Sequence, residues 1–356
     1  MRIGALFEPN SAANYRIGYP LAAMERRGHQ ILWPDQRGLA SLASLLECDA
    51  VLIYRRSGAE LRQGIRRMRE AGVAVIWDND DDFLHMPKNR RNRRDSGGRS
   101  TQQIFTDTMK TARSVDAVVV TTEPLAAVMA DAGVPGARVI ANHLMFDKRP
   151  ARPHEGVVIG WIGGLEHRAD ALGVNLPNVL SDLMDKHPRL TVTTVGVELP
   201  LRDRARYDHS IFVEFQNLPD QMAGWDIGLA PLLDTPFNRS RSDIKLKEYA
   251  ASRLPWVASP HGPYAGLGDA QGGRLAADDG WFDALDALIS DPKARKRLSS
   301  AGGAWARRHT IDAVADEYET LFATAVAKAS GQPVVAPRQP LGARLTRGLR
   351  RRVAAQ

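Results

Sequence analysis

The chain has 356 residues, of which 44% are hydrophobic and 25% are charged. This length is more than one hydrophobic core usually serves, so we expect two domains, and the composition excludes fibrous and short disulfide-rich proteins. The one cysteine, Cys48, cannot form an internal disulfide, and we expect a buried thiol in a reducing compartment.

The net charge of +7 lies almost entirely at the end of the chain. Residues 330–356 contain six arginines and no acidic residue, which leaves the rest of the chain close to neutral. No apolar run reaches the roughly 18 residues that a membrane-spanning helix needs, and the first residues do not read as a secretory signal. We therefore expect a cytoplasmic protein with a basic tail.

The first part of the chain alternates short apolar runs with helical patterns, which predicts a parallel sheet covered by helices. A helix is expected between Tyr15 and Arg27, because apolar residues recur at helical spacing and Gly28 follows as a stop. Residues 1–146 are predicted to form one Rossmann-like domain. Its expected strands are Ile3–Phe7, Gln30–Trp33, Ala50–Tyr54, Val73–Trp77, Ala117–Val120 and Arg138–Ala141.

Residues 147–156 are rich in proline and charge, and we expect them to form a linker. A second alternation follows over residues 157–310, with helices expected near 173–186, 242–252, 280–290 and 293–308. A last helix, over residues 311–329, is expected to return to the first domain. The fold class is therefore α/β, with two tandem, doubly wound Rossmann-like domains. The expected strands of the second domain are Val157–Trp161, Leu190–Val195, Ile211–Phe215, Ile227–Ala230 and Pro255–Ala258.

An acidic run, residues 78–82, directly follows the fourth predicted strand. Ligands of open parallel sheets bind where strands end, so these carboxylates are expected beside a binding cleft. Like charges this close resist simultaneous ionisation unless cations or hydrogen-bond donors offset them. A divalent metal site is one interpretation, and ligand binding or loop capping is another. The loop at Glu8–Ser11 also has two interpretations, a contact in the cleft or a helix cap.

A glycine pair, Gly163-Gly164, follows the first strand of the second domain. Glycines let a phosphate or sugar approach the backbone closely, and a following helix start offers free N–H groups to an anion. The spacing matches neither G-x-G-x-x-G nor a P-loop, so a plain turn is the alternative. His167, a few residues on, is expected either to contact a ligand or to be an exposed loop histidine.

A second polar loop, after the strand at 227–230, leads into a helix that Ser242 or Asp243 is expected to cap. Lys245 and Glu248 then lie three residues apart on one helical face, just after Arg241. Such a group suits a nucleoside diphosphate, because the cations neutralise phosphate and a carboxylate accepts hydrogen bonds from ribose hydroxyls. A surface ion pair is the plainer interpretation.

The sequence around this loop resembles that of a known family of enzymes. The string FNRSRSDIKLKEYAASRLPWVAS, preceded by WDIGLAPL and GWIGGLEHRAD, is similar to the carboxy-terminal half of GT-B fold glycosyltransferases of the family 4 type, glycosyl transferases group 1. In these enzymes a strand leads into a loop, a K-x-x-E-Y-x-A helix and P-V-V-A-S. The likeness covers most of residues 157–260 and, more loosely, the two-domain layout.

The resemblance implies roles for particular residues. Arg241 and Lys245 would be the catalytic cations on the donor diphosphate, and Glu248 would hold the ribose. Asn142-His143 resembles the turn that closes the first domain in this family. No metal or other cofactor is expected, since GT-B enzymes generally stabilise the leaving diphosphate with side-chain cations and a helix end. The implied substrate-binding residues are Gly163, Gly164, His167, Phe237, Asn238, Ser242 and Glu248. Asp80 and Asp81 are expected on the acceptor side from their place after the fourth predicted strand, and the resemblance assigns them no role.

The implied activity is transfer of a sugar, with retention, from a nucleotide-diphosphate sugar to a glycan, lipid carrier or small molecule, as in cell-envelope polysaccharide synthesis. The sequence departs from the family's E-x7-E motif, since Ser240 stands at the first glutamate position. That departure leaves the donor-sugar contacts open. A non-hydrolysing sugar-nucleotide epimerase and a non-catalytic GT-B scaffold are the alternatives.

Two basic segments bear on partners. In residues 340–356 apolar residues recur every four positions between arginines, so this tail is either a basic amphipathic helix on the inner face of an anionic membrane or a solvated tail. A second basic run, residues 88–99, is expected to be a mobile loop. Nucleic acid is not an expected partner, because neither run has interleaved aromatic residues.

Overall fold

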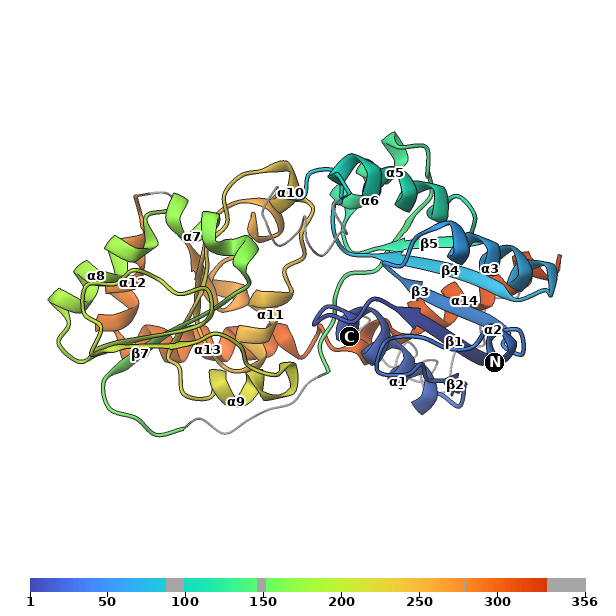
Figure 1. The fold of residues 1–356 in the computed structure, drawn as a ribbon. Helices are drawn as coiled ribbons and strands as arrows, with labels where there is room; N and C mark the ends of the chain where they lie inside the picture. The colour runs from blue at the N-terminus through green and yellow to red at the C-terminus, as the bar shows by residue number, and fades with distance from the viewer. Residues whose placement is uncertain (88–98, 146–151, 278, 332–356) are drawn as a thin grey trace, which may run out of the picture.

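The computed structural model describes residues 1–87, 99–145, 152–277 and 279–331, and the predicted linker, tail and basic run fall largely outside them. Two separate parallel sheets of six strands lie side by side, each covered by helices on both faces (Figure 1). The strand orders are β2-β1-β3-β4-β5-β6 and β12-β11-β10-β7-β8-β9. The predicted α/β class with two tandem doubly wound domains is confirmed.

The first sheet contains every strand predicted for it, with ends shifted by two residues at most. Its central strands β3 and β4 are buried along their whole length, as their continuous apolar sequences require. The strands are β1 (Arg2–Phe7), β2 (Gln30–Leu32), β3 (Ala50–Tyr54), β4 (Ala74–Asn79), β5 (Ala117–Val120) and β6 (Arg138–Val139). The helices are η1 (Asn14–Gly18, π-helical), α1 (Tyr19–Arg26), α2 (Leu42–Leu45), α3 (Ala59–Glu70), α5 (Thr101–Ala112) and α6 (Glu123–Asp131).

The second sheet is built in the same way. Its strands are β7 (Val157–Gly163), β8 (Leu190–Gly196), β9 (Tyr207–Ser210), β10 (Ile227–Ala230), β11 (Trp256–Ala258) and β12 (Gly273–Leu275). Its helices are α7 (Arg168–Gly173), α8 (Leu176–Lys186), α9 (Leu218–Met222), α10 (Pro236–Arg239), α11 (Ile244–Ala251), α12 (Trp281–Ser290) and α13 (Pro292–Ala306). Short 3-10 turns lie at Leu165–His167, Phe215–Asn217, Gly262–Tyr264, Asp269–Gln271 and Ile311–Val314.

Two predictions for the second domain were wrong, and one strand was missed. The strand expected at Ile211–Phe215 lies instead at β9, and Ile211 and Phe212 are 84% and 71% exposed, so this apolar run is not a buried strand. Strand β12 was not predicted, because three residues carry no alternating pattern. The helix expected at 173–186 starts later, since α7 ends at Gly173 and Asn175 adopts a left-handed conformation with φ 53° before α8.

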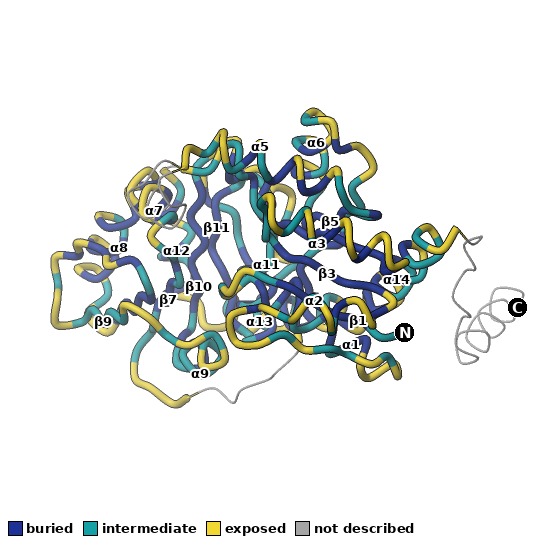
Figure 2. Tube along the Cα trace, turned by 45° about the vertical axis from the view of Figure 1, so that its right-hand side comes forward, coloured by how far each residue is buried: buried dark blue, intermediate teal, exposed yellow. Residues whose placement is uncertain are grey.

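The last helix, α14 (Ala315–Ala329), returns to the first domain as predicted. It packs against β4 and α1, and Figure 2 shows it beside the buried strand β3. Its Tyr318 and Phe322 join the core of that sheet. The Lys328 ammonium donates to the Asp116 carbonyl at 2.8 Å, and Arg27 of α1 pairs with Glu319 at 2.6 Å. The second domain is therefore held to the first at both ends of its chain.

The chain crosses between the domains at two neighbouring points. At the first crossing Leu144 accepts, through its carbonyl, a hydrogen bond of 2.7 Å from the N–H of Ile311 at the second crossing. The Leu144 N–H donates to the His309 carbonyl at 2.9 Å. The rings of His143 and His309 stack with centroids 6.0 Å apart. These contacts make the junction a paired crossing rather than a free tether.

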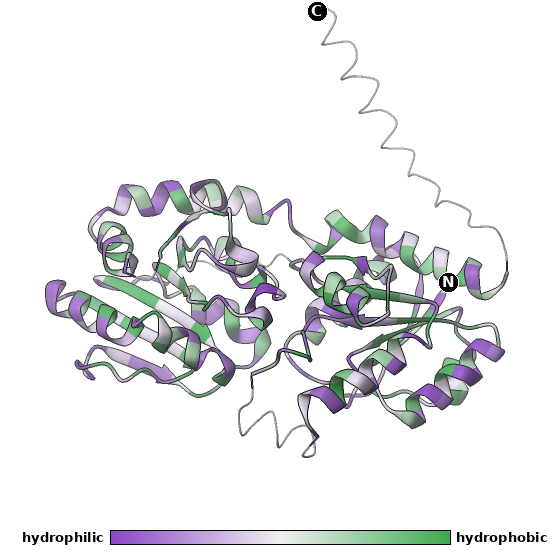
Figure 3. Cartoon of the chain, turned by 90° about the horizontal axis from the view of Figure 1, so that it is seen from above, coloured by the Kyte–Doolittle hydropathy of each residue, from purple (hydrophilic) through white to green (hydrophobic). Residues whose placement is uncertain are grey.

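Large apolar side chains fill the interior of each domain. The five tryptophans of the second domain, at 161, 225, 256, 281 and 305, are buried, and so is Cys48, as expected. Along the outer helices hydrophilic and hydrophobic residues alternate (Figure 3). Within the described residues no helix is long and apolar enough to cross a membrane.

Candidate functional site

The ends of strands from both sheets meet where the two domains face each other, and α11 is the helix of the second domain nearest that boundary (Figure 1). The hydroxyl of Thr122, at the start of α6, donates to the Ser240 carbonyl at 2.8 Å. The side-chain amide of Asn142 donates to the Ser242 hydroxyl at 3.0 Å. The backbone carbonyl of Asn142 accepts from the Lys247 ammonium at 3.0 Å. These hydrogen bonds join the loop before α11 and α11 itself to the first domain.

Lys245 lies in the first turn of α11, directed toward the carboxyl end of β7. Its ammonium donates to the Ile162 carbonyl at 2.5 Å. Burial lowers the pKa of Lys245 to about 8, against the opposing attraction of Glu248. The side chain is thus a cation near its titration point at neutral pH, placed beside a helix start and the glycine pair.

Glu248, one turn along α11, has a partner that the sequence does not indicate. Its carboxylate accepts a short hydrogen bond from the hydroxyl of Tyr15, which comes from η1 in the first domain. Burial raises the pKa of Glu248, while the Tyr15 bond acts to lower it. The predicted surface ion pair with Lys245 is wrong, because each residue is engaged elsewhere.

Arg241 precedes α11 and lies over the ring of Phe237, with its guanidinium carbon 5.3 Å from the ring centroid. Phe237 is buried, so the ring holds the arginine in place without neutralising it. Among the described residues neither Arg241 nor Lys245 has a carboxylate within ion-pair distance. The two predicted catalytic cations therefore face the cleft without a fixed counter-ion.

The glycine pair forms the turn that faces these cations. Gly163 ends β7, and its carbonyl accepts from the Val197 N–H at 2.9 Å. A Cβ at Gly164 would collide with the carboxylate of Glu166, so this side chain folds back over the glycine. Burial acts to raise the pKa of Glu166, but His167 and Arg241 hold it below its ordinary value. An ionised carboxylate thus lies in the loop that the sequence assigns to the diphosphate.

His167 is buried, and the alternative of an exposed loop histidine is wrong. Its Nδ1 lies 2.9 Å from Asp170, and Asp170 also accepts from the Asn238 amide at 2.8 Å. Burial lowers the pKa of His167 to about 4, and Arg241 acts in the same direction. Asn238 is consequently a support beneath the site, joining the loop after β10 to the start of α7.

Ser242 and Asp243 both miss the capping role predicted for one of them. Asp243 stands at the N-cap position of α11, but its side chain makes no cap hydrogen bond. It pairs with the buried Lys247 at 2.7 Å instead, and the Ser242 hydroxyl accepts from Asn142. Both polar side chains therefore serve the junction between the domains, and the free N–H groups of α11 keep no side-chain cap.

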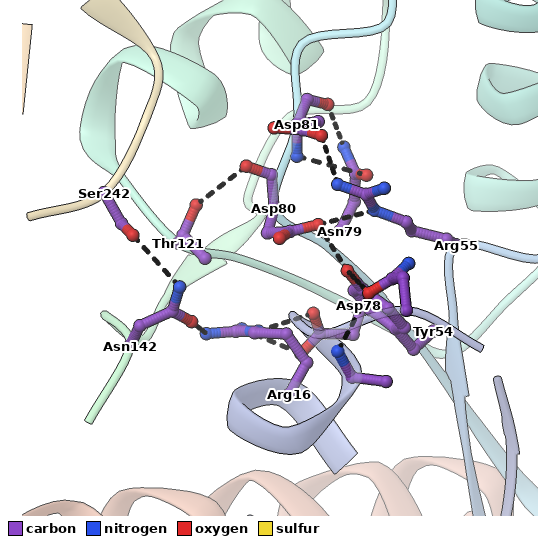
Figure 4. Close-up of polar contacts among 12 residues, drawn as sticks. Arg16, Tyr54, Arg55, Asp78, Asn79, Asp80, Asp81, Thr121, Asn142 and Ser242 are labelled. Atoms are coloured by element: carbon purple, nitrogen blue, oxygen red, sulfur yellow. Dashed lines mark hydrogen bonds and ion pairs between the residues drawn. The ribbon is translucent and has the colours of Figure 1, made fainter. Parts of the chain in front are cut away.

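The acidic run after β4 is held by partners on every carboxylate. Asp78 forms two hydrogen bonds with Arg16, at 2.7 and 2.8 Å, in a fully buried pair. Asp80 accepts from Arg55 at 2.6 Å and from the Tyr54 hydroxyl at 2.8 Å, and Asp81 pairs with the same Arg55 (Figure 4). This arginine has φ 60°, a strained conformation at the end of β3.

The end of the run is a loop cap, because Asp82 accepts from the Leu84 and His85 N–H groups at 3.0 and 3.2 Å. Asn10 caps in the same way, accepting from the Ala13 N–H at 3.0 Å, as one interpretation of its loop predicted. No group of three or more His, Cys, Asp or Glu within the described ranges is arranged to hold a metal ion. Asp80 and Asp81 are the carboxylates of the run nearest the cleft.

The sequence missed four residues of this cleft. Tyr15 and Arg16 fall within a predicted helix, and Glu166 and Lys247 stand in the quoted strings at positions to which no role was assigned. Arg16 also donates to the Ile140 carbonyl at 2.6 Å and the Asn142 side chain at 3.2 Å, so it ties the ends of β4 and β6 together. These roles depend on contacts with distant segments of the chain, and such contacts are a property of the tertiary structure.

Solved structures show what kind of fold this is. Two tandem parallel sheets with a returning carboxy-terminal helix and a cleft between them form the GT-B glycosyltransferase fold, and the fold implied by the sequence resemblance is confirmed. No protein-family model matches the chain, and no curated protein matches its sequence. The evidence for the fold is therefore entirely structural.

Three solved proteins illustrate the likeness. Sucrose-phosphate synthase (tll1590) from Thermosynechococcus elongatus has a TM-score of 0.64 and 12% identity, over 90% of this chain and 98% of that one. Alr3699/HepE from Anabaena, in complex with UDP-glucose, has a TM-score of 0.61 and 15% identity, over 90% and 99%. TarM from S. aureus, in complex with UDP among other ligands, has a TM-score of 0.56 and 12% identity over 79% of this chain. The chain spans 58% of TarM.

Proposed function

We propose that the protein is a glycosyltransferase that moves a sugar from a nucleoside-diphosphate sugar to an acceptor held in the cleft between the domains. The observation that carries this proposal is the pair Arg241 and Lys245. Both face the glycine turn at an uncapped helix start, and neither has a fixed counter-ion among the described residues. A cationic pocket of this kind suits a diphosphate, and the fold is that of enzymes that use such donors.

In the proposed complex the donor diphosphate lies between Gly164 and the start of α11. Lys245 supplies a point charge and Arg241 a planar guanidinium, while the nearby helix N–H groups donate hydrogen bonds to the remaining phosphate oxygens. Glu248 would release Tyr15 and accept hydrogen bonds from the ribose. Phe237 and the Asp170–Asn238 pair keep the cationic loop in position.

The chemical step breaks the bond between the anomeric carbon and the diphosphate oxygen, and a bond to an acceptor hydroxyl oxygen forms in its place. The diphosphate leaves with the electron pair and gains negative charge, which Arg241 and Lys245 stabilise where it develops. The acceptor hydroxyl gives its proton to an oxygen of the departing diphosphate as its own oxygen bonds to the anomeric carbon. Closure of the cleft would exclude water and limit hydrolysis of the donor.

The acceptor would bind on the side of the first domain, where Asp80 and Asp81 accept hydrogen bonds from its hydroxyls. We also propose that the anomeric configuration is retained, as the sequence resemblance implies. A glycan or lipid-linked acceptor of cell-envelope synthesis and a peripheral membrane contact by the tail belong to the same proposal. No resident metal or cofactor takes part in it.

The direct test is a thermal-shift screen of the full chain against UDP, GDP, ADP and dTDP and their sugars. A ligand that binds only the folded state raises the free energy of unfolding by about 2.7 kcal/mol at a hundredfold excess over Kd. The unfolding midpoint rises accordingly. We expect one nucleobase to stabilise the protein. The absence of any shift across the panel would favour a non-catalytic scaffold. A rearranged sugar nucleotide formed without acceptor would identify an epimerase instead.

A further inference from the structure

We propose that Asn142 is a positioning residue that orients the hydroxyl of Ser242 as a hydrogen-bond donor to the diphosphate of the sugar nucleotide. The inference rests on the proposed function and adds to it a polar chain that runs from the buried interior of the first domain to the start of α11. The direction of each hydrogen bond in this chain follows from which atoms can donate and which can accept.

The chain begins at a buried ion pair. Asp78 accepts two hydrogen bonds from Arg16, and both side chains are fully buried. Arg16 also donates to the side-chain oxygen of Asn142 at 3.2 Å, and Asn142 is itself only 3% exposed. An arginine side chain carries donors and no acceptor, so the amide oxygen of Asn142 must face Arg16 and its NH2 group must point away from it. The first domain therefore sets the orientation of this amide.

The NH2 group of Asn142 is directed to the second domain. It donates to the Ser242 hydroxyl at 3.0 Å, and Figure 4 shows Asn142 between Arg16 and Ser242. The Lys247 ammonium, from α11, donates to the backbone carbonyl of Asn142 at 3.0 Å and holds this residue at the same boundary. Because the NH2 group can only donate, the Ser242 oxygen must accept, and the proton of the Ser242 hydroxyl is directed to another group.

The position of Ser242 indicates which group receives that proton. Ser242 directly follows Arg241 and precedes Asp243, the N-cap residue of α11, so its hydroxyl lies at the positive end of this helix. A diphosphate bound by Arg241 and Lys245 would accept a charge-assisted hydrogen bond from it. The Ser242 hydroxyl is then the last donor of the chain, and Asn142 acts on the ligand through it.

The experiment is a double-mutant cycle on the full chain. Its probe is the nucleoside diphosphate, among UDP, GDP, ADP and dTDP, that raises the unfolding midpoint most, and Kd is measured by calorimetric titration. Ser242→Ala removes a hydrogen bond to a charged group and should weaken binding about tenfold. Asn142→Leu removes the donor that orients the hydroxyl and should weaken binding about fourfold. The double variant should bind about as weakly as Ser242→Ala alone, because no hydroxyl remains to be oriented.

Asn142→Asp is the second variant at this position, because it keeps an acceptor for Arg16 and so preserves the buried end of the chain. An ionised carboxylate accepts but cannot donate, so the Ser242 hydroxyl would turn toward it and away from the ligand. Affinity should fall at least as far as in Ser242→Ala, and unfolding midpoints show which variants are folded.

Two controls separate orientation of the hydroxyl from general support of the fold. Asn178→Leu makes the same substitution at an exposed asparagine of α8 and should leave Kd unchanged. Thr122→Val removes the neighbouring hydrogen bond between the domains, to the Ser240 carbonyl, and should leave Kd close to the native value because the chain through Asn142 stays intact.

Several outcomes would overturn the inference while leaving the transferase in place. These are native affinity in Ser242→Ala or in Asn142→Asp, losses that multiply in the double variant, and a loss in Thr122→Val as large as that in Asn142→Leu. Failure of every nucleotide to bind the native protein would instead remove the proposed function itself.

Discussion

The two walls of the cleft use their charged side chains in opposite ways. On the first-domain wall, the acidic run after β4 is locked, with Asp78 paired to Arg16 and Asp80 and Asp81 to Arg55. On the second-domain wall, Arg241 and Lys245 are held by a ring face and a carbonyl, and no carboxylate pairs with them in the described part of the chain.

This difference shows what each wall is for. A buried charge is stable only when a partner and hydrogen bonds satisfy it, so the locked pairs of the first domain hold strand ends in register. Cations without a fixed partner keep their attraction for an incoming anion. Substitutions on the first-domain wall should therefore lower the free energy of unfolding, whereas substitutions on the second-domain wall should lower the activity.

The largest effect is expected at the first wall. Arg16→Met leaves Asp78 buried without its partner and should lower the free energy of unfolding by about 3–5 kcal/mol, measured by urea denaturation. Arg26→Met is the matched control, since Arg26 pairs with Asp312 at the surface and should change stability by less than about 1 kcal/mol. Equal losses in the two variants would show that the buried pair does not hold the domain together.

The next effect is expected at the second wall. Lys245→Ala should lower the transfer rate by about 10²–10³-fold, because a preorganised charge on the leaving group is lost, while the unfolding midpoint stays close to that of the native chain. Lys186→Ala, which removes an exposed lysine of the same domain that pairs with Asp286, should leave the rate unchanged. Full activity in the Lys245 variant would discard the assignment.

A smaller effect, of about tenfold per pH unit, is expected from the titration of Lys245. Its pKa is lowered to about 8 by burial, so the side chain is protonated below this pH and neutral above it. Affinity for the nucleoside diphosphate should hold constant below pH 7 and fall as the pH rises through 8, as calorimetric titration can measure. In Lys245→Arg the charge persists, and an equally steep fall there would place the titration elsewhere.

The smallest effect is expected at the contact that joins the walls. Tyr15→Phe removes the hydroxyl that holds Glu248, so the carboxylate is already free for ribose, and nucleotide affinity should rise about fivefold, the worth of one net hydrogen bond. The double variant Tyr15→Phe/Glu248→Ala should lose this gain, because nothing remains to be released. A gain that persists in the double variant would rule out Glu248 as the ribose ligand.

Most strands could be predicted from the sequence, because fully buried parallel strands are continuous apolar runs, as in β3 and most of β4. The same rule failed at Ile211–Phe215, where an apolar run is exposed, and at the three-residue β12. In the candidate site, the residues that carry the family resemblance were predicted because they lie in short continuous motifs. Tyr15 was not, since 233 residues separate it from Glu248.

By itself the sequence determined the α/β class, the tandem arrangement and the cations at the start of one helix, because periodicity and helix starts are local properties of the chain. Only the tertiary structure decided which charges are locked and which remain open. Whether Arg16, Glu166 or Glu248 has a partner depends on groups from distant strands and from the other domain. Their pairing follows from burial and distance, which no spacing along the chain encodes.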